Sequence, residues 1–233
     1  MKKSITTIVL FLVAAFANGA DENFRQDFDL SKCEWSSIGR NDYFILEPGY
    51  QETLDGREGI EKVHLVVTVL NETRIVNRVE TRIVEEREIH DGELDEISRN
   101  YFAICFPSND IYYFGESVDS YDDGKIESHE GSWEAGIGSA KAGLFMPANP
   151  QPGDRFYQEL APKLAMDRVE IVSKTISLKT TAGEFHDCLK TKETTPLEWG
   201  KEYKVYAKGV GVVQDGDLLL TKYGKISSFR ENP

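Results

Sequence analysis

Residues 74–106, RIVNRVETRIVEEREIHDGELDEISRNYFAICF, decide the fold class of this chain. Two runs rich in β-branched and aromatic residues, which favour strands, flank the pair Asp91-Gly92. Asp-Gly is a preferred pair for a two-residue hairpin turn, because both central positions need positive φ. Although the apolar positions of 74–89 also fit a helical stripe, the turn and the residue types predict strands over 74–89 and 93–106.

The same signals recur along the rest of the chain, where turn pairs separate short strand-like runs. The turn pairs are Pro48-Gly49, Asp91-Gly92, Asp123-Gly124, Pro152-Gly153, Ala182-Gly183 and Asp215-Gly216. The expected strands are 43–46, 63–70, 74–89, 93–106, 110–118, 125–134, 154–160, 168–180, 184–195, 202–207 and 210–226. This rhythm predicts an all-β chain whose curved antiparallel sheet, a meander, forms a half-barrel or sandwich.

Two irregular segments interrupt the alternation of apolar and polar residues. Small residues and prolines dominate the stretch between Gly136 and Gly153. Loops of this length inside a compact domain are often functional or protective, so we expect one long Gly/Pro-rich loop that acts as a lid or covers a sheet edge. In 168–180 the apolar positions change parity between Ile171 and Val172, which predicts a bulge that curves the sheet.

The first twenty residues have the organisation of a secretory signal peptide. Lys2 and Lys3 precede an apolar run from Ile5 to Ala17, small residues permit cleavage after Ala17 or Gly19, and no cysteine stands there to accept a lipid. No stretch approaches the roughly 18 apolar residues of a membrane helix. We therefore expect a signal peptide over 1–20, a single antiparallel β domain over 21–233, no integral membrane protein, and a periplasmic or secreted location.

The charge balance excludes two classes of partner. The chain has 27 Lys and Arg against 40 Asp and Glu, a formal net charge of −13. Nucleic acid and anionic lipid headgroups are bound by clustered basic side chains, so neither is expected. The acidity is typical of a soluble protein and is also compatible with cation binding.

Three cysteines, Cys33, Cys105 and Cys188, would meet an oxidising compartment after export, so one disulfide and a remaining thiol are expected. Cys105 and Cys188 both fall in predicted strands, where a bridge across the sheet is geometrically reasonable. This pair is the disulfide candidate. His186 shares a strand face with Cys188, but that alternation alone does not indicate a catalytic thiol.

Four short motifs resemble a family of uncharacterised exported bacterial proteins. The motifs are YYFGE at 112–116, EGSWEAG at 130–136, MPANP at 146–150 and KGVGVV at 208–213. The hallmark runs of the family read WYFGE, GSWEAG and PGVG, and the resemblance covers about residues 41–224. It implies a bacterial, extracytoplasmic context and brings no established activity. This chain departs from the family pattern at 100–108, where the usual acidic, Gly-containing hairpin is absent.

Strand alternation in these motifs identifies candidate ligand-binding residues. Alternation places Tyr112, Phe114 and Glu116 on one face and Tyr113 on the other. If neighbouring strands bring Glu116 near Glu130 or Glu134, and glutamates of later strands join them, three or more carboxylates converge. The candidates are Tyr112, Phe114, Glu116, Glu130, Trp133, Glu134, Glu159 and Glu193.

A converged cluster of carboxylates repels itself unless a proton or a hard cation such as Ca²⁺ neutralises it. The same glutamates could instead lie on a solvated face and pair with Lys190, Lys192 or Arg155. Most aromatic residues are expected in the core. His64, His90, His129 and His186 are scattered singly, so the sequence does not predict a zinc site, and no catalytic residue is assigned.

These observations favour a non-enzymatic envelope protein that binds a small apolar or amphipathic ligand within a curved sheet. An acidic, calcium-binding protein is the alternative, and a hydrolase that uses a pair of carboxylates is the third reading. No cofactor is expected, and calcium belongs only to the alternative reading.

Overall fold

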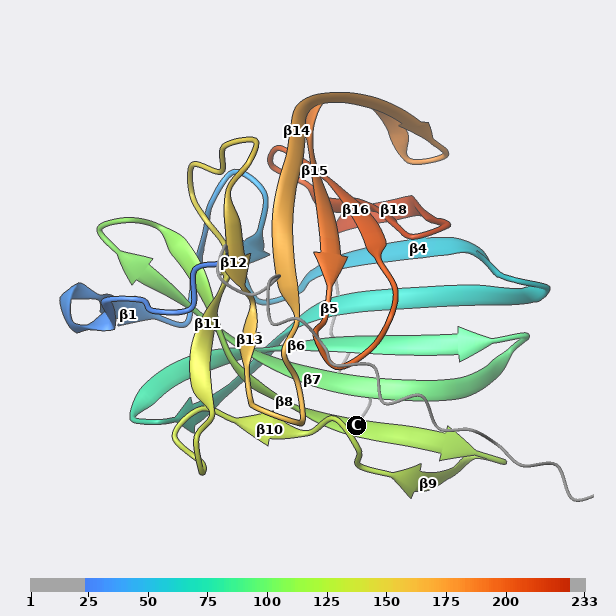
Figure 1. Ribbon diagram of the computed structural model, residues 1–233. Helices are drawn as coiled ribbons and strands as arrows, with labels where there is room; N and C mark the ends of the chain where they lie inside the picture. The colour runs from blue at the N-terminus through green and yellow to red at the C-terminus, as the bar shows by residue number, and fades with distance from the viewer. Residues whose placement is uncertain (1–23, 227–233) are drawn as a thin grey trace, which may run out of the picture.

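The computed structural model describes residues 24–226, in which β-strands dominate (Figure 1). Within these residues the helical structure is one short 3-10 turn, η1 (Leu30–Lys32). No helix in the described part of the chain is long and apolar enough to cross a membrane. The all-β prediction is confirmed, and the expected signal peptide over 1–20 lies outside the described residues.

The main sheet is built from antiparallel neighbours. From one end to the other its order is β12 (Arg155–Tyr157), β14 (Arg168–Thr180), β15 (Gly183–Thr194), β16 (Glu202–Ala207), β17 (Gly211–Asp215), β18 (Leu218–Lys225), β4 (Tyr50–Glu58), β5 (Glu61–Val76), β6 (Val79–His90), β7 (Glu93–Phe106), β8 (Asp110–Asp122), β11 (Lys141–Met146) and β13 (Glu159–Leu160). Beside this path, β1 (Glu34–Ser36) pairs with β7, and β9 (Lys125–Ser128) and β10 (Trp133–Glu134) pair with β8. A separate two-stranded sheet contains β2 (Gly39–Arg40) and β3 (Ile45–Leu46).

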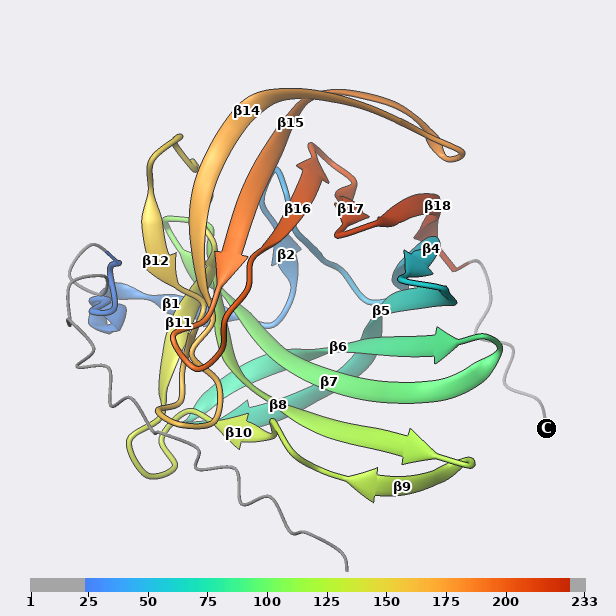
Figure 2. The ribbon, with the colours of Figure 1, turned by 45° about the vertical axis from the view of Figure 1, so that its right-hand side comes forward.

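The two ends of this sheet meet at Gln158. The end strands β12 and β13 are separated in the chain by this residue alone. The Gln158 backbone N–H donates to the carbonyl of Asp167 at 2.8 Å, and its Nε2 donates to the carbonyl of Phe145 at 3.0 Å. As a result the sheet curves over itself, and Figures 1 and 2 show β14 and β15 arching over the layer formed by β4 to β8. The predicted curved sheet is a nearly closed half-barrel.

Turn chemistry explains most of the hairpins. Asp91 and Asp123 both have φ of 49°, and the glycines that follow them are also at positive φ, as predicted. A further turn at Asn77 and Arg78, with φ of 47° and 69°, splits the predicted strand 74–89. Asn tolerates this conformation better than most residues but Arg does not. Only one of the two turn residues was therefore of a type that predicts a turn.

Two strands differ from the sequence prediction. The predicted strand 63–70 continues to Val76, and its partner β4, Tyr50–Glu58, was missing from the predicted strands because its residues are mostly polar. The predicted bulge between Ile171 and Val172 is confirmed, since the pairing of β14 with β15 shifts register between Ile171 and Ser173.

The predicted Gly/Pro-rich loop between Gly136 and Gly153 contains a strand. Lys141–Met146 form β11, which pairs with β8 on one side and β13 on the other. A Cβ added at Gly143 would lie 2.2 Å from the carbonyl oxygen of Gln158, so a small residue is required there by close backbone approach. The interpretation of the whole segment as a lid is therefore wrong, because its centre lies inside the sheet.

The disulfide joins Cys33 to Cys105, so the predicted pair of Cys105 and Cys188 is wrong. Trp35 of β1 lies opposite Cys105 of β7, and this pairing brings Cys33, directly before β1, to a Cα distance of 4.8 Å from Cys105. Cys188 is a buried free thiol on β15 in a different hydrophobic cluster, which includes Val205. The short strand β1 was not among the predicted strands, so the sequence offered no reason to pair Cys33.

Candidate functional site

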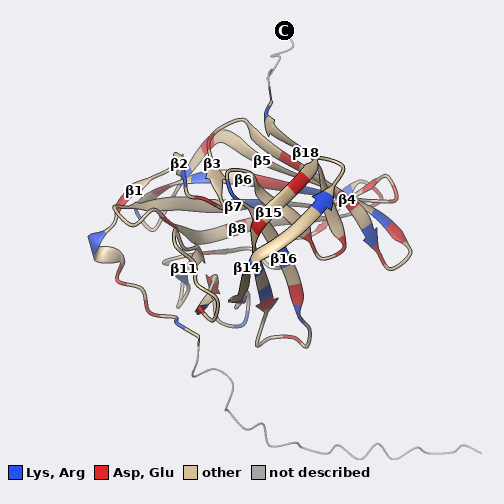
Figure 3. Cartoon of the chain, turned by 90° about the horizontal axis from the view of Figure 1, so that it is seen from above, with Lys and Arg blue, Asp and Glu red and all other residues tan. Residues whose placement is uncertain are grey.

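Acidic side chains from strands all around the half-barrel face a common interior. Asp215 raises the pKa of both Glu86 and Glu193, Glu86 raises that of Glu116, and Glu116 raises that of Glu159. Such effects weaken with distance, so these residues of β6, β8, β13, β15 and β17 lie near one another. We call them the acidic interior. Figure 3 shows Asp and Glu on strands from both halves of the sheet.

A bulge in β8 decides which residues accompany Glu116. Asn100 of β7 pairs with Glu116 and Phe102 pairs with Tyr113, so β8 has one extra residue between them. Gly115 occupies this position with φ of 134°, a conformation that L side chains rarely adopt. The extra residue turns the Tyr113 side chain to the face of Glu116, whose pKa the Tyr113 hydroxyl lowers. A bulge often re-aims a side chain in this way.

Trp133 lies directly opposite Glu116 in the pairing of β10 with β8. The Trp133 side chain is buried, and its ring centroid is 5.5 Å from that of Tyr113. Its Nε1 meets no acceptor at hydrogen-bond distance among the described residues. It is nevertheless close enough to Glu116 that the indole N–H lowers the pKa of that carboxyl. A buried donor without a partner is uncommon in native structures, and this one is directed to the acidic interior.

Burial makes three of these glutamates weaker acids than exposed glutamates are. It is the largest cause that raises the pKa of Glu86, Glu116 and Glu193 to about 7. The charged form is disfavoured where the protein replaces water, and neighbouring carboxylates add to the effect. Burial also raises the pKa of Glu159 well above its ordinary value, with Asp167 as the next cause. Near neutral pH the acidic interior therefore holds protons that exposed glutamates would have lost.

One ammonium group is shared among several of these carboxylates. Lys204 of β16 lies with its Nζ 3.1 Å from Asp215 Oδ2 and 3.6 Å from Glu193 Oε2. The same ammonium lowers the pKa of Glu86. Burial, and after it the nearby Glu193, raises the pKa of the Tyr206 hydroxyl on the same strand. Because Lys204 is still 25% exposed at its side chain, the interior is accessible to water.

The structure brings together four of the predicted ligand-binding residues. These are Glu116, Trp133, Glu159 and Glu193, which all contribute to the acidic interior. The predicted alternation that grouped Tyr112 and Phe114 with Glu116 is wrong because of the bulge in β8.

Tyr112 and Phe114 lie against the N-terminal segment instead. The Tyr112 ring packs edge-on against Phe28 and Trp35, and Phe114 packs against Trp35 at a centroid distance of 5.2 Å. Both rings are buried. They therefore stabilise the cover formed by the N-terminal segment rather than contact a ligand inside the half-barrel.

Glu130 and Glu134 do not join the acidic interior. Glu134 lies opposite Gly115 and forms an ion pair with Arg74, and Glu130 is exposed in the turn before β10. The expected convergence of Glu116 with either of them is not found. Trp133, between them in sequence, is the residue that faces Glu116, because neighbouring residues of a strand point to opposite faces.

The sequence reasoning missed half of the site. Glu86, Lys204, Tyr206 and Asp215 were not among the candidates, although each lies in a strand. Glu86 lies two residues from Val84 and from Glu88 along β6 and so shares a face with them, and Lys204 shares a face with Tyr206 along β16 in the same way. That alternation could have sorted them by face, but only the closure of the sheet shows which face is inside.

The interior aromatic rings form packed core. Phe102 stacks on Tyr113 at a centroid distance of 4.6 Å, and Phe145 lies 4.7 Å from Phe102 and 5.1 Å from Phe44. The expectation that most aromatic residues belong to the core holds for this group.

A depression of about 300 Å³ opens beside the acidic interior. It lies at the connection between β15 and β16, where the Trp199 side chain is 97% exposed. Glu193 of the acidic interior and the neighbouring Asp167 belong to its lining, and Glu202 and Lys201 lie at the β16 side. An isolated exposed tryptophan beside carboxylates is a suitable contact for a cationic ligand, because the ring face attracts positive charge.

Comparison with known proteins finds one distant likeness. No known family matches the chain, and no curated protein matches it. Among solved structures, the chain is similar to a candidate lipoprotein from Parabacteroides distasonis, known from a crystal structure at 2.70 Å resolution. The two sequences are 11% identical, the alignment covers 80% of this chain and 100% of that chain, and the TM-score is 0.39.

Proposed function

We propose that this chain is an exported, non-enzymatic envelope protein that binds a small amphipathic ligand, and that the acidic interior receives a cationic group of that ligand. The observation that carries the proposal is the buried set of carboxylates around Lys204, whose Nζ lies 3.1 Å from Asp215 Oδ2 and 3.6 Å from Glu193 Oε2. The same ammonium lowers the pKa of Glu86. More carboxyl groups are buried here than the Lys204 ammonium can neutralise, so the others keep their protons. A ligand cation can replace those protons.

The chemistry beside Glu116 supports an amphipathic ligand over a purely apolar one. The buried rings of Trp133 and Tyr113 pack beside Glu116, so apolar surface and negative charge lie at the same place. Aromatic faces together with carboxylates are the usual recognition elements for alkylated ammonium groups. A ligand without charge would leave the carboxyl groups buried and uncompensated, which costs free energy.

Export is supported by the disulfide between Cys33 and Cys105, since disulfides persist mainly in oxidising compartments. The apolar run from Ile5 to Ala17 and the resemblance to exported bacterial proteins agree with that location.

Calcium is the second candidate ligand, and a specific arrangement favours it. Glu159 and Asp167 are close enough that Glu159 Oε2 accepts from the backbone N–H of Asp167 at 3.4 Å. With Glu193 at the same depression, three carboxylates supply the oxygen ligands that Ca²⁺ prefers. Calcium would relieve the same repulsion that we assign to the cationic ligand.

Calorimetric titration with matched amphiphiles tests the proposal. The probes are dodecyltrimethylammonium and dodecyl sulfate, which share a chain length and differ in charge, both below their micelle concentrations. We expect the cationic probe alone to bind, and the double variant E116Q/E193Q to weaken it about tenfold or more, which corresponds to about 1.4 kcal/mol. The matched control E127Q/E130Q changes two exposed glutamates and should bind as the unmodified protein does.

Three outcomes are informative. Equal binding of both probes, or an E116Q/E193Q variant that binds normally, would contradict the proposal. A rise in melting temperature with calcium chloride that E116Q/E193Q abolishes would favour the calcium alternative. Native mass spectrometry of protein purified from its own host checks the result independently, because a retained amphiphile appears as added mass.

A further inference from the structure

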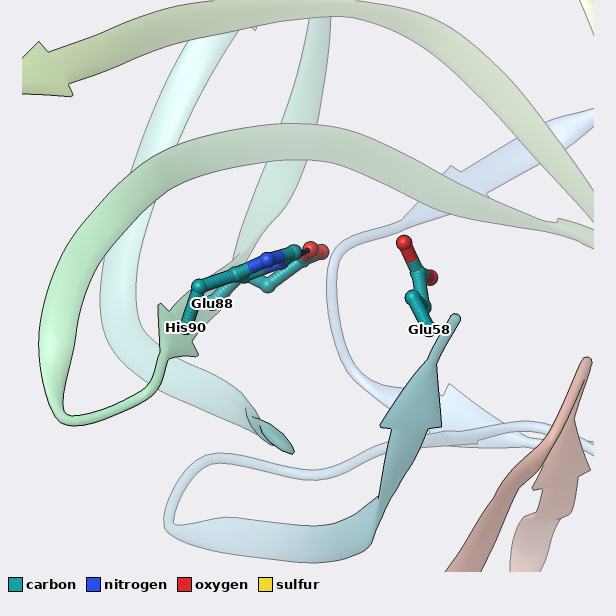
Figure 4. A group of neighbouring side chains, drawn as sticks. All are labelled: Glu58, Glu88 and His90. Carbon is teal, nitrogen blue, oxygen red and sulfur yellow. Dashed lines mark hydrogen bonds and ion pairs between the residues drawn. The ribbon is translucent and has the colours of Figure 1, made fainter. Parts of the chain in front are cut away.

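Three potential metal ligands meet at the rim of the half-barrel, outside the acidic interior. Glu88 and His90 are two residues apart along β6, so both side chains leave the same face of the strand. Glu58 is the last residue of β4. Figure 4 shows Glu88 and His90 extending side by side towards Glu58. One ligand atom from each of the three lies within 4.8 Å of the others.

The curvature of the sheet explains this meeting. β4 and β6 are separated by β5, so their backbones lie about 9.6 Å apart, two strand spacings. On the concave face of a curved sheet, side chains from such alternate strands lean together. Glu58 lies 30 residues before Glu88 in the chain, which is why spacing along the sequence indicated no metal site.

A third carboxylate, that of Glu61, orients the imidazole. Glu61 Oε2 lies 3.1 Å from His90 Nδ1, and Glu88 Oε1 lies 2.5 Å from His90 Nε2. A histidine that ligates a metal through one nitrogen almost always donates from the other to a carboxylate or a carbonyl. Glu61 supplies that support on the Nδ1 side, while Nε2 contacts Glu88.

We propose that Glu58, Glu88 and His90 Nε2 bind a divalent transition-metal ion, for which zinc is the probe, with Glu61 as the residue that orients His90. This site goes beyond the proposed function, because it uses none of the carboxylates assigned to the amphipathic ligand.

The donor set and its surroundings agree with zinc. Zinc is commonly bound by histidine nitrogen and carboxylate oxygen at about 2.0–2.2 Å, and three protein ligands leave a fourth position open. Tetrahedral ligands at those lengths lie about 3.3 Å apart, so the exposed Glu58 must move inward as the ion binds. A depression of about 720 Å³ lies beside the site and is lined by Glu61 and His90, although Glu58 and Glu88 do not line it.

The identity of the ion follows from the nitrogen donor. Calcium takes oxygen ligands at longer distances and gains nothing from imidazole. The proton that His90 holds passes to solvent when the metal binds, because metal ligands must be deprotonated. The doubly charged ion then replaces a single positive charge beside three carboxylates.

Zinc titration of the full chain by calorimetry tests the site. We expect one zinc ion per chain, loss of that binding in His90→Ala, and a tenfold or greater loss in Glu58→Gln. Glu61→Gln should weaken zinc about 10- to 100-fold without removing a ligand, as expected for a group that orients a ligand. The matched control is His64→Ala, because His64 lies in the same β4–β5 hairpin as Glu58 and Glu61 and also has a carboxylate partner, Asp55, at 2.7 Å.

Cobalt(II) provides a second measurement that does not depend on affinity alone. Its visible absorption should show a low-symmetry nitrogen and oxygen environment in the unmodified protein and in His64→Ala, and that absorption should disappear in His90→Ala. Circular dichroism of each variant establishes that it is folded. Zinc binding that survives His90→Ala, or no zinc binding in the unmodified protein, would overturn the proposal. The variant E116Q/E193Q should keep the metal, so failure of this site and failure of the proposed function are separable.

Discussion

Lys204 and Asp215 form an ion pair inside the half-barrel, with Nζ 3.1 Å from Oδ2 and the side chains 25% and 16% exposed. The pair lies on adjacent strands, since Lys204 and Asp215 are opposite each other in the register of β16 and β17. Its position among other carboxylates makes it the electrostatic centre of the acidic interior.

Removing this ammonium should destabilise the protein. Lys204→Met leaves buried carboxylates without a counter-ion, and breaking a buried pair costs about 3 kcal/mol, the lower end of the usual range because Lys204 keeps some contact with water. Chemical denaturation measures the free energy of unfolding. Lys208→Met is the control, because Lys208 is exposed and pairs with Asp42 at the surface, and it should change stability far less. Equal effects of the two substitutions would contradict the role of Lys204.

Stability should fall as the pH rises from about 5 to about 8. Glu86, Glu116 and Glu193 have pKa values raised to about 7 in the folded protein, above their ordinary value. Between the two values the folded state binds more protons than the unfolded state, so the free energy of unfolding decreases with pH. His90, whose pKa Glu88 and Glu61 raise to about 9, acts in the same direction, because its contribution is complete below about 6.5 and is lost as the pH passes 9.

Melting temperatures measured across this range test the sign. The triple variant E86Q/E116Q/E193Q removes three of the titrating groups and should make the profile less steep, while E127Q/E130Q should not. A profile that rises steadily from pH 5 to pH 8 in the unmodified protein would show that these carboxyls are ionised at little cost.

Peptide mapping should find Cys33 linked to Cys105, with Cys188 modified by alkylating reagents only after unfolding. Replacing both linked cysteines by serine should lower the free energy of unfolding by up to about 4 kcal/mol, since the bridge closes a loop with a sequence separation of 72. Cys188→Ser leaves the bridge intact and serves as the comparison. A mixed population that includes a bridge to Cys188 would contradict the assignment.

Gly115→Ala should be more damaging than glycine substitutions elsewhere at positive φ. A Cβ at Gly115 would lie 2.2 Å from the carbonyl oxygen of Trp133, so β10 must move away from β8. Gly138→Ala is the matched control, because Gly138 also has positive φ but has no atom within 4 Å of the added Cβ. The control should cost about 1–2 kcal/mol from backbone conformation alone, and thermal unfolding should show a larger loss for Gly115→Ala.

The candidate site was only partly predictable from sequence. Alternation identified Glu116, Trp133, Glu159 and Glu193 as strand residues with suitable chemistry, yet it grouped Tyr112 and Phe114 with Glu116. One extra residue at Gly115 reversed that grouping, because a single insertion in a pattern of period two moves every following side chain to the opposite face. No local signal distinguished Lys204 from the other lysines.

The sequence by itself determined the class of structure: β-branched runs, Asp-Gly turns and the parity change at Ile171 specify antiparallel hairpins and a bulge through residues only a few positions apart. The tertiary structure alone decided that Cys33 meets Cys105, that the sheet closes at Gln158, and that carboxylates from five strands share one interior. Those relationships depend on register and curvature accumulated over the whole sheet, and the energy of a buried charge depends on which groups the closed sheet places around it.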